Sequence, residues 1–306
     1  MWPTMLCRPT NHDLTVLAPA KLNLFLRIVA RRPDGFHEIE SVMAAVDFYD
    51  TLTFERSTTG EIDLKVVDCS PRSSVGSVRS EASSGPANLV VRAAMLLREH
   101  TGCFRGAKIT LVKRIPSSAG LGGGSSDCAA TLGALNRLWE LGLEQSELVE
   151  LAGRLGSDVP FFLSGSPMAV CAGRGERIAP LQISRNIHCV IARPETGLST
   201  PAVYRACRVD DTGKDVGSFV TRLRSGDLSQ MAQRLHNGLQ APAEALSGDV
   251  RQLRERFEKL PVVAHQMSGS GSAYFGVCWS RRHATAIASR LRALGVPWVK
   301  VVRTCP

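Results

Sequence analysis

The residues best suited to chemistry lie in a loop rich in glycine and serine, PSSAGLGGGSSD, at positions 116–127. The segment after it has apolar residues at Ala129, Leu132 and Leu135, the spacing of an amphipathic helix. Glycine lets the backbone turn several N–H groups toward one point, and the start of the helix adds its own unpaired N–H groups. Such a loop can cradle phosphate, although a glycine-rich connection that binds nothing has the same composition.

This loop matches neither of the common nucleotide-binding patterns. A P-loop has lysine after its last glycine, where this chain has Ser125, and no strand-to-acid unit of the dinucleotide pattern trails the loop. A second glycine and serine loop, MSGSGS, occupies positions 267–272. A tight turn would explain the second loop equally well. Two such loops in one basic chain favour a single polyphosphate site.

Two charged residues stand in unusual settings. Lys21 lies inside the apolar run PAKLNLFL, where an amine needs a partner if it is buried. It is therefore either a functional amine beside a carboxylate or phosphate, or a charge that protects a strand edge. Asp158 follows Gly156 and precedes Pro160, so it either caps a helix or acts as a general base.

The elements that position these residues can be predicted from hydrophobic spacing. In the first half of the chain we expect a strand over 14–30, a turn at 32–35, and a strand pair at 50–54 and 62–67. Further on we expect a helix over 88–100, a strand over 107–112, a helix over 126–139 capped by Ser125 or Ser126, and a helix over 144–155. The second half predicts strands at 188–192 and 274–279, and largely helical segments at 217–246, 249–259 and 283–294.

The alternation of strands and helices indicates an α+β protein of two domains. The length of 306 residues also exceeds what one hydrophobic core usually serves. The first domain is predicted to cover 1–170 and the second 171–306. Residues 70–86 are rich in serine, glycine and proline, which predicts a flexible surface insertion.

Composition excludes several classes of function. No apolar run reaches the ~18 residues of a membrane span, and the first residues do not resemble a secretory signal, so a cytoplasmic protein is expected. Nine cysteines without a CxxC pair, and histidines without ligand spacing, argue against a disulfide framework or a zinc site. The net charge of +9 suits anionic ligands, but the basic residues are scattered and form no block typical of nucleic-acid binding.

Together these segments carry a resemblance. The segments 19–26, 116–127 and 267–273 are similar, in this order, to the three motifs of the GHMP kinase superfamily, and GFHEIESV and GSDVPFFLSG extend the match. The resemblance implies an N-terminal half like ribosomal protein S5 domain 2, which binds ATP, and a ferredoxin-like C-terminal half, which binds substrate. Within the superfamily, the chain resembles members that phosphorylate the 2-hydroxyl of a cytidylyl-bearing methylerythritol in isoprenoid precursor synthesis.

The resemblance also implies roles for individual residues. Asp158 would take the proton from the acceptor hydroxyl, and Lys21 would keep Asp158 ionised and stabilise the hydroxyl oxygen. Asn88 and Lys113 would line the adenine pocket, and Mg²⁺ would bridge phosphate oxygens, with Ser126 a candidate ligand but no protein ligand assigned. The residues implied to bind ATP along the loop are Pro116, Gly120, Gly122, Gly123, Gly124, Ser125 and Ser126.

For the acceptor, the resemblance implies that Phe36 and His37 hold the cytosine, with Tyr204 as the opposite platform. Asn23, Gly269 and Ser270 complete the substrate-binding set. Met43 departs from the family pattern, where phenylalanine is frequent, and this wall of the pocket is therefore softer.

Two alternatives remain open at this point. The ATP motifs are shared by kinases of mevalonate, homoserine or sugars, and only the segment around His37 and the GSDVPFF context favour a cytidylyl acceptor. An RNA-binding protein is a second alternative, since the S5-like half and the charge permit it, but the chain lacks the motifs of RNA-binding modules. We expect a small-molecule substrate and neither nucleic acid nor membrane as partner; the oligomeric state is not predicted.

Overall fold

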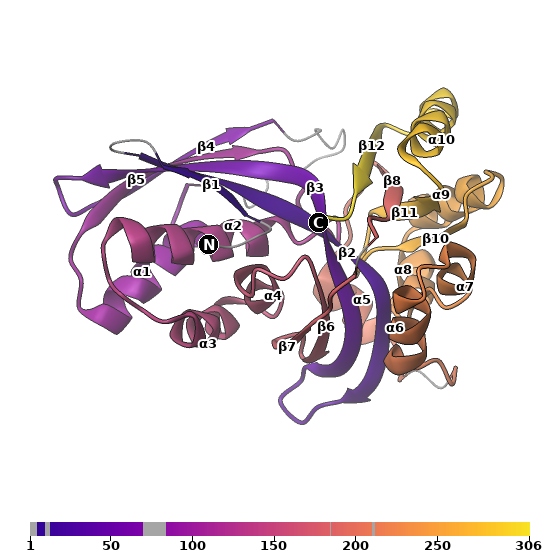
Figure 1. Cartoon of the computed structure of the whole chain (residues 1–306), viewed down its shortest axis with the longest axis horizontal. Coiled ribbons are helices and arrows are strands. Elements are labelled where there is room, and N and C mark those ends of the chain that lie inside the picture. The colour runs from indigo at the N-terminus through magenta and orange to yellow at the C-terminus, as the bar shows by residue number, and fades with distance from the viewer. Residues whose placement is uncertain (1–4, 10–12, 70–83, 184, 210–211) are drawn as a thin grey trace.

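The computed structural model describes residues 5–9, 13–69, 84–183, 185–209 and 212–306. They form two β-sheets with helices packed against each (Figure 1). The larger sheet has the order β1-β2-β3-β5-β4, with β6 on β3, β7 on β6 and β9 on β2; the smaller has the order β10-β11-β8-β12. This mixed architecture agrees with the expected α+β class.

A long β-hairpin connects the two halves of the molecule. β2 (Asp13–Arg31) pairs with β3 (His37–Ser57) along almost its whole length, and the expected strand over 14–30 is confirmed. Burial alternates at the start of β2, but from Ala18 to Leu26 every residue is buried, because both faces of the strand are covered there. The turn between the strands contains Gly35, whose φ of 84° lies in the left-handed region that glycine adopts without strain.

The remaining strands of the larger sheet differ from the prediction in one respect. β4 (Ile62–Asp68) pairs in parallel with β5 (Gly106–Lys113), and β5 pairs with β3. The expected strands at 50–54 and 62–67 both exist, but they are not partners, because β5 lies between them. The other members of this sheet are β1 (Leu6–Pro9), β6 (Met168–Gly173), β7 (Arg177–Pro180) and β9 (His236–Asn237).

The N-terminal helices pack against one face of the larger sheet (Figure 1). These are α1 (Leu89–Thr101), α2 (Gly123–Leu138), α3 (Gln145–Leu155) and α4 (Val159–Leu163). Their apolar sides form one buried cluster with the strands, which includes Leu132 and Leu135 of α2 and Leu52 and Phe54 of β3. The predicted helices over 88–100 and 144–155 agree with α1 and α3 to within a residue.

The C-terminal half places its helices around the smaller sheet. Its strands are β8 (His188–Arg193), β10 (Ala264–Met267), β11 (Tyr274–Cys278) and β12 (Trp298–Arg303). Its helices are α5 (Thr200–Ala206), α6 (Val216–Arg224), α7 (Leu228–Ala232), α8 (Gln240–Leu246), α9 (Gly248–Glu258) and α10 (Arg281–Ala293). The segment 217–246 is therefore helical as predicted, apart from the short strand β9 between α7 and α8.

Alternation along β8 explains how the two halves are joined. Val190 and Ala192 face the cluster that includes α9 and α10, whereas Cys189 and Ile191 face a second cluster that includes Leu22 of β2. The smaller sheet thus packs against helices on one face and against the long hairpin on the other.

Two predictions about the organisation of the chain are not tested by the described residues. Most of the serine-rich insertion expected over 70–86 lies outside the described residues, and the expected boundary at residue 170 stays a prediction. Within the described ranges, no helix has the length and apolar character needed to cross a membrane.

Candidate active site

The glycine-rich loop leads directly into the first turn of α2. Gly120 and Gly122 have φ angles of 72° and 70°, a conformation that glycine adopts without strain. α2 begins at Gly123 with Gly122 as its N-cap, and no described side chain caps it. The expected cap by Ser125 or Ser126 is wrong, because the glycines already follow the helical path and both serines lie inside the helix. The start of α2 therefore presents backbone N–H groups rather than a serine cap.

The two glycine-rich loops are in direct contact. The hydroxyl of Ser268 donates to the carbonyl oxygen of Gly120 at 3.0 Å, and the N–H of Ala273 donates to the carbonyl oxygen of Ala119 at 3.0 Å. A Cβ atom at Gly120 would lie 2.0 Å from the carbonyl oxygen of Ser268. The two loops thus form one wall, and the single polyphosphate site expected from the sequence stays a prediction.

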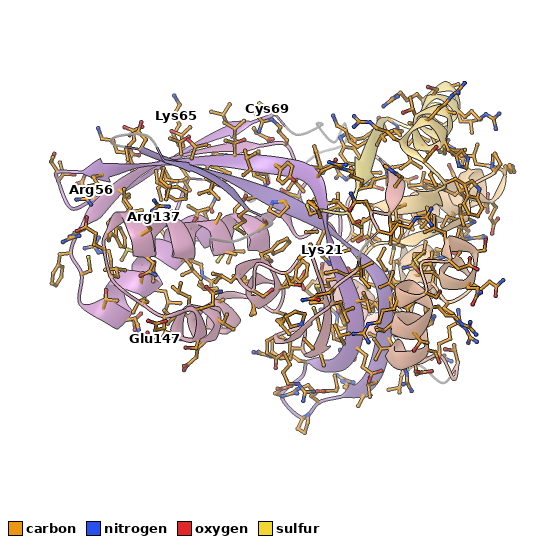
Figure 2. The ribbon with its side chains drawn as sticks, in the orientation of Figure 1. Lys21, Arg56, Lys65, Cys69, Arg137 and Glu147 are labelled. Atoms are coloured by element: carbon orange, nitrogen blue, oxygen red, sulfur yellow. The ribbon has the colours of Figure 1, made fainter. Side chains whose placement is uncertain are left out.

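Lys21 lies on β2 beneath this wall, between the two halves of the molecule (Figure 2). Its residue surface is 3% exposed, and its Nζ donates to Oδ1 of Asn23 at 2.5 Å and lies 3.3 Å from Oδ2 of Asp158. Nδ2 of Asn23 in turn donates to the hydroxyl of Ser41 on β3 at 2.8 Å. The amine is thus held in place by Asn23 and paired with a carboxylate, as a buried cation requires.

The aspartate of this pair comes from the segment before α4. Asp158 immediately precedes α4, but its side chain makes no capping hydrogen bond there. Its side chain is 28% exposed and lines the cavity. Of the two interpretations left open by the sequence, the geometry favours a functional carboxylate over a helix cap.

A second buried charge cluster lies under the glycine-rich loop. The ammonium of Lys113 on β5 pairs with Asp50 of β3 and, at 2.8 Å, with Asp127 of α2. Asp50 also accepts the N–H of Ile115 at 2.9 Å, so it holds the chain that enters the loop. Lys113 lines the cavity, but these carboxylates already engage the amine expected to meet adenine.

Burial governs the protonation of this cluster. Burial raises the pKa of Asp127 although the nearby Lys113 opposes this shift, because the carboxylate is fully enclosed. Burial alone would lower the pKa of Lys113, but Asp127 and Asp50 outweigh burial and raise it. Oδ1 of Asp127 and Oγ of Ser126 are buried and lack a hydrogen-bond partner among the described residues.

Aromatic residues surround the opposite end of the cavity. The ring centroids of His37 and Tyr204 are 5.3 Å apart, so the residue expected to read the base edge lies directly beside the expected platform. Phe36 is 49% exposed, and the guanidinium of Arg174 lies 4.9 Å from its ring centroid. Burial and the charge of Arg31 lower the pKa of His37, so the imidazole is neutral at pH 7 and offers one donor and one acceptor.

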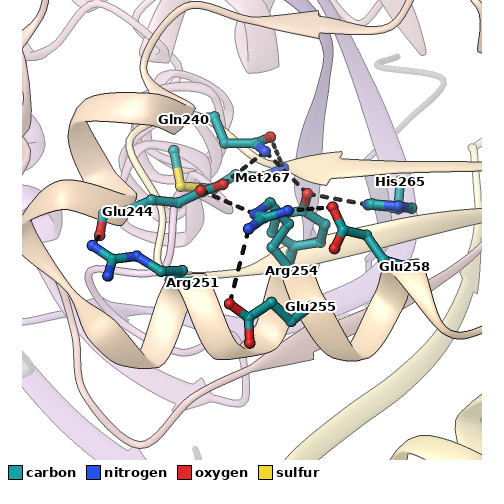
Figure 3. Close-up of polar contacts among 9 residues, drawn as sticks. Gln240, Glu244, Arg251, Arg254, Glu255, Glu258, His265 and Met267 are labelled. Atoms are coloured by element: carbon teal, nitrogen blue, oxygen red, sulfur yellow. Dashed lines mark hydrogen bonds and ion pairs between the residues drawn. The ribbon is translucent and has the colours of Figure 1, made fainter.

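The loop at 267–272 is fixed from behind by polar side chains. Nδ2 of Asn237 donates to the carbonyl oxygens of Met267 at 2.8 Å and Gly269 at 2.9 Å. The amide oxygen of Gln240 accepts the N–H of Met267 at 3.1 Å. Its amide nitrogen donates to Glu244, which in turn forms an ion pair with Arg254 (Figure 3). This network connects α8 and α9 to the edge of the site.

These walls enclose a cavity of about 1030 Å³. All the site residues predicted from the sequence line it except Ser126, which is fully buried behind the loop. The sequence analysis missed Asp50, Asp127, Arg174 and Thr200. Asp127 is the last residue of the glycine-rich motif, and Asp50 is a charged residue within an apolar strand. Lys21 was identified by the same property, a charge in an unusual setting, so both aspartates could have been predicted.

The arrangement can transfer a phosphoryl group. Glycine-rich backbone and the start of α2 favour polyphosphate at one end, and aromatic rings favour a base at the other. A carboxylate paired with an ammonium lines the same cavity, where it can accept a proton from a hydroxyl group.

Comparison with known proteins agrees with this geometry. Residues 88–166 match the family model described as GHMP kinases N terminal domain, and residues 219–296 match GHMP kinases C terminal. A 4-diphosphocytidyl-2-C-methyl-D-erythritol kinase from Pelotomaculum thermopropionicum is 38% identical over 91% of this chain and 94% of its own length. One from Symbiobacterium thermophilum is 40% identical over 90% and 94%, respectively.

Solved structures give the same result. A crystal structure of 4-(cytidine 5'-diphospho)-2C-methyl-D-erythritol kinase is 37% identical and superimposes with a TM-score of 0.76, covering 94% of this chain and 98% of that one. A homoserine kinase from Cytophaga hutchinsonii shares the fold with a TM-score of 0.72 at 16% identity, covering 97% and 96% of the two chains.

Proposed function

The chain belongs to the GHMP kinases, and we propose that this small-molecule kinase transfers the γ-phosphoryl group of ATP to the 2-hydroxyl of 4-diphosphocytidyl-2-C-methyl-D-erythritol. The reaction would serve isoprenoid precursor synthesis in the cytoplasm. Relatives that carry the name of this kinase match the chain over nine-tenths of its length, which supports this acceptor over mevalonate or homoserine.

The observation that carries the proposal is the Lys21–Asp158 pair. Its 3.3 Å separation places a carboxylate and an ammonium together beside the phosphate-binding loop and within the same cavity as His37 and Tyr204. A hydroxyl group bound between these ends would reach a base, a cation and a phosphoryl donor at once. Positioning of this kind is most of what phosphoryl transfer requires from a protein.

In the proposed reaction, a carboxylate oxygen of Asp158 accepts the proton of the acceptor hydroxyl. The hydroxyl oxygen then forms its bond to the γ-phosphorus while the bond from that phosphorus to the β,γ-bridging oxygen breaks, and ADP leaves with the electron pair. The ammonium of Lys21 stabilises negative charge on the attacking oxygen, and Asn23 keeps the amine in position.

Mg²⁺ belongs to the proposal as the partner of the phosphates. Oδ1 of Asp127, which lines the cavity, is buried and lacks a hydrogen-bond partner in the described part of the chain. A carboxylate oxygen of this kind suits Mg²⁺, and Asp127 would hold it, whereas Ser126 is not among the residues that line the cavity. When bound, the ion would neutralise charge on the phosphate oxygens.

Acceptor recognition rests on the aromatic end of the cavity. The neutral imidazole of His37 can pair with the edge of cytosine, and Tyr204 and Phe36 offer ring faces for stacking. A cytidylyl group bound there would leave its methylerythritol end free to extend toward Asp158.

A substrate panel tests the proposal. The purified protein is incubated with ATP, Mg²⁺ and one acceptor at a time: the cytidylyl compound, 2-C-methyl-D-erythritol 4-phosphate, mevalonate or homoserine. Phosphorus NMR should detect a new 2-phosphate with the cytidylyl compound alone. Efficient phosphorylation of mevalonate or homoserine, with none of the cytidylyl compound, would contradict it.

A further inference from the structure

Arg193, the last residue of β8, is a buried cation for which the structure offers no counter-charge. Its residue surface is 7% exposed, and its Nε is buried without a hydrogen-bond partner among the described residues. Burial lowers its pKa, and no described carboxylate acts on it in the opposite direction. By contrast, the partly buried Arg254 is paired with Glu244 at 3.0 Å.

The strand register shows which way Arg193 points. Side chains alternate along β8, so Arg193 shares a face with Cys189 and Ile191. Its cross-strand partner Trp298 lies in the same buried cluster as these two residues. That cluster also contains Ala119 and Leu121, so this face of β8 packs toward the glycine-rich loop, and Arg193 lies behind the residues that line the cavity.

Gly197 leaves space between Arg193 and this loop. A Cβ atom at Gly197 would lie 3.5 Å from Cβ of Ser118 and 3.8 Å from Nη2 of Arg193, in contact with both. The φ of Gly197 is not among the positive values, so backbone geometry does not require glycine there. The missing side chain of Gly197 leaves room between the guanidinium group of Arg193 and Ser118, which precedes the phosphate cradle.

An unpaired buried guanidinium is costly, and a bound anion would offset that cost. Its planar donor groups match phosphate oxygens. We propose that Arg193 is a phosphate-binding residue that completes the site beside Ser118 when substrate binds. This inference rests on the proposed function, which brings two sources of the same chemistry into the cavity: the polyphosphate of ATP and the diphosphate of the acceptor.

The first test uses inorganic pyrophosphate and needs no turnover. Arg193→Met removes an uncompensated buried charge, so the unliganded variant should unfold at the same temperature as wild type or higher. Pyrophosphate should raise the unfolding temperature of wild type and raise that of Arg193→Met far less. Gly197→Val fills the space without changing the charge and should reduce the pyrophosphate effect as well. Arg56→Met, at the far end of the larger sheet, is the matched control and should respond as wild type does (Figure 2).

Calorimetric titration with ADP and with CDP then identifies the source of the phosphate. Loss of one charge-assisted contact should weaken binding by roughly 10-fold or more. Weaker binding of ADP by Arg193→Met assigns the residue to the nucleotide donor, and weaker binding of CDP assigns it to the acceptor. Unchanged affinity for both, or a lower unfolding temperature with intact pyrophosphate stabilisation, would overturn the inference. These results are independent of the substrate panel, so either proposal can fail alone.

Discussion

The backbone N–H of Lys21 donates to the carbonyl oxygen of Leu121 at 2.9 Å, which ties the strand of the proposed catalytic pair to the glycine-rich loop. A Cβ atom at Gly122 would lie 2.9 Å from Cγ of Lys21, so the two segments also pack closely. The cation of the proposed catalytic pair is thus tied directly to the phosphate cradle.

Replacing Lys21 with methionine should separate catalysis from nucleotide binding. The amine acts on Asp158 and on the attacking oxygen, so turnover should fall by about 100-fold or more, while ATP still binds backbone groups of the loop. Turnover and calorimetric ATP affinity are the two measurements. Loss of ATP affinity with normal turnover at saturating ATP would show that Lys21 binds phosphate and does not act in catalysis.

Substituting Gly120 with alanine tests the contact between the two glycine-rich loops. The new Cβ would lie 2.0 Å from the carbonyl oxygen of Ser268, and we expect a loss of about 1–3 kcal/mol in the free energy of unfolding beyond backbone strain, together with weaker ATP binding.

Gly142 provides the matched control, because its φ is also 72° and nothing lies within 4 Å of its Cβ position. Gly142→Ala therefore carries the backbone strain without the clash. Equal denaturant midpoints for the two variants would show that the loops do not constrain each other.

His37→Ala should weaken the acceptor and spare ATP. Leaving a buried base group unpaired costs about 1–3 kcal/mol, which should raise the KM for the acceptor by roughly 10-fold or more. Because burial lowers the pKa of His37, the ring stays neutral in more acidic buffer than an ordinary histidine would, and acceptor binding by wild type should weaken only once that ring becomes protonated. An equal loss of ATP and acceptor binding would indicate misfolding, and an unchanged acceptor KM would remove His37 from the site.

Asp127→Asn should change how stability depends on pH. The pKa of Asp127 is raised in the folded chain, so below its ordinary value the carboxyl group is neutral in both states and resembles asparagine. As the pH rises toward the raised value, ionisation costs more in the folded state than in the unfolded state, and wild type should lose stability relative to the variant. Urea denaturation at pH 4, 5.5 and 7 measures this; a pH-independent difference would contradict the assignment.

The sequence predicted much of this site because its motifs are local. Lys21, the glycine-rich loop and Asp158 each lie in a short segment whose composition is unusual for its setting. Chain spacing could not indicate that Asp50 and Lys113 pair, because β3 and β5 meet only in the folded sheet. The start of α2 could not be predicted from the sequence, because Gly123 and Gly124 have low helix propensity and therefore do not indicate a helix.

Arg193 was missed for a related reason. It precedes Pro194 at the end of an apolar strand, a position that is usually a solvated strand end. It is buried only in the folded protein, where it lies opposite Trp298 of β12 on the face of β8 that packs against the cluster shared by both halves of the chain.

The central claim is that Asp158 is the general base, and turnover of Asp158→Asn tests it most directly. The variant keeps the size of the side chain and lies outside the nucleotide cradle, so it should still fold and its affinity for ATP should match that of wild type. Its unfolding temperature should be lower, because the buried amine of Lys21 loses its carboxylate partner. Single-turnover phosphorylation of 4-diphosphocytidyl-2-C-methyl-D-erythritol should be slower by roughly 100-fold or more, with the residual rate due to positioning alone. Near-normal single-turnover phosphorylation by a folded Asp158→Asn protein would contradict the account.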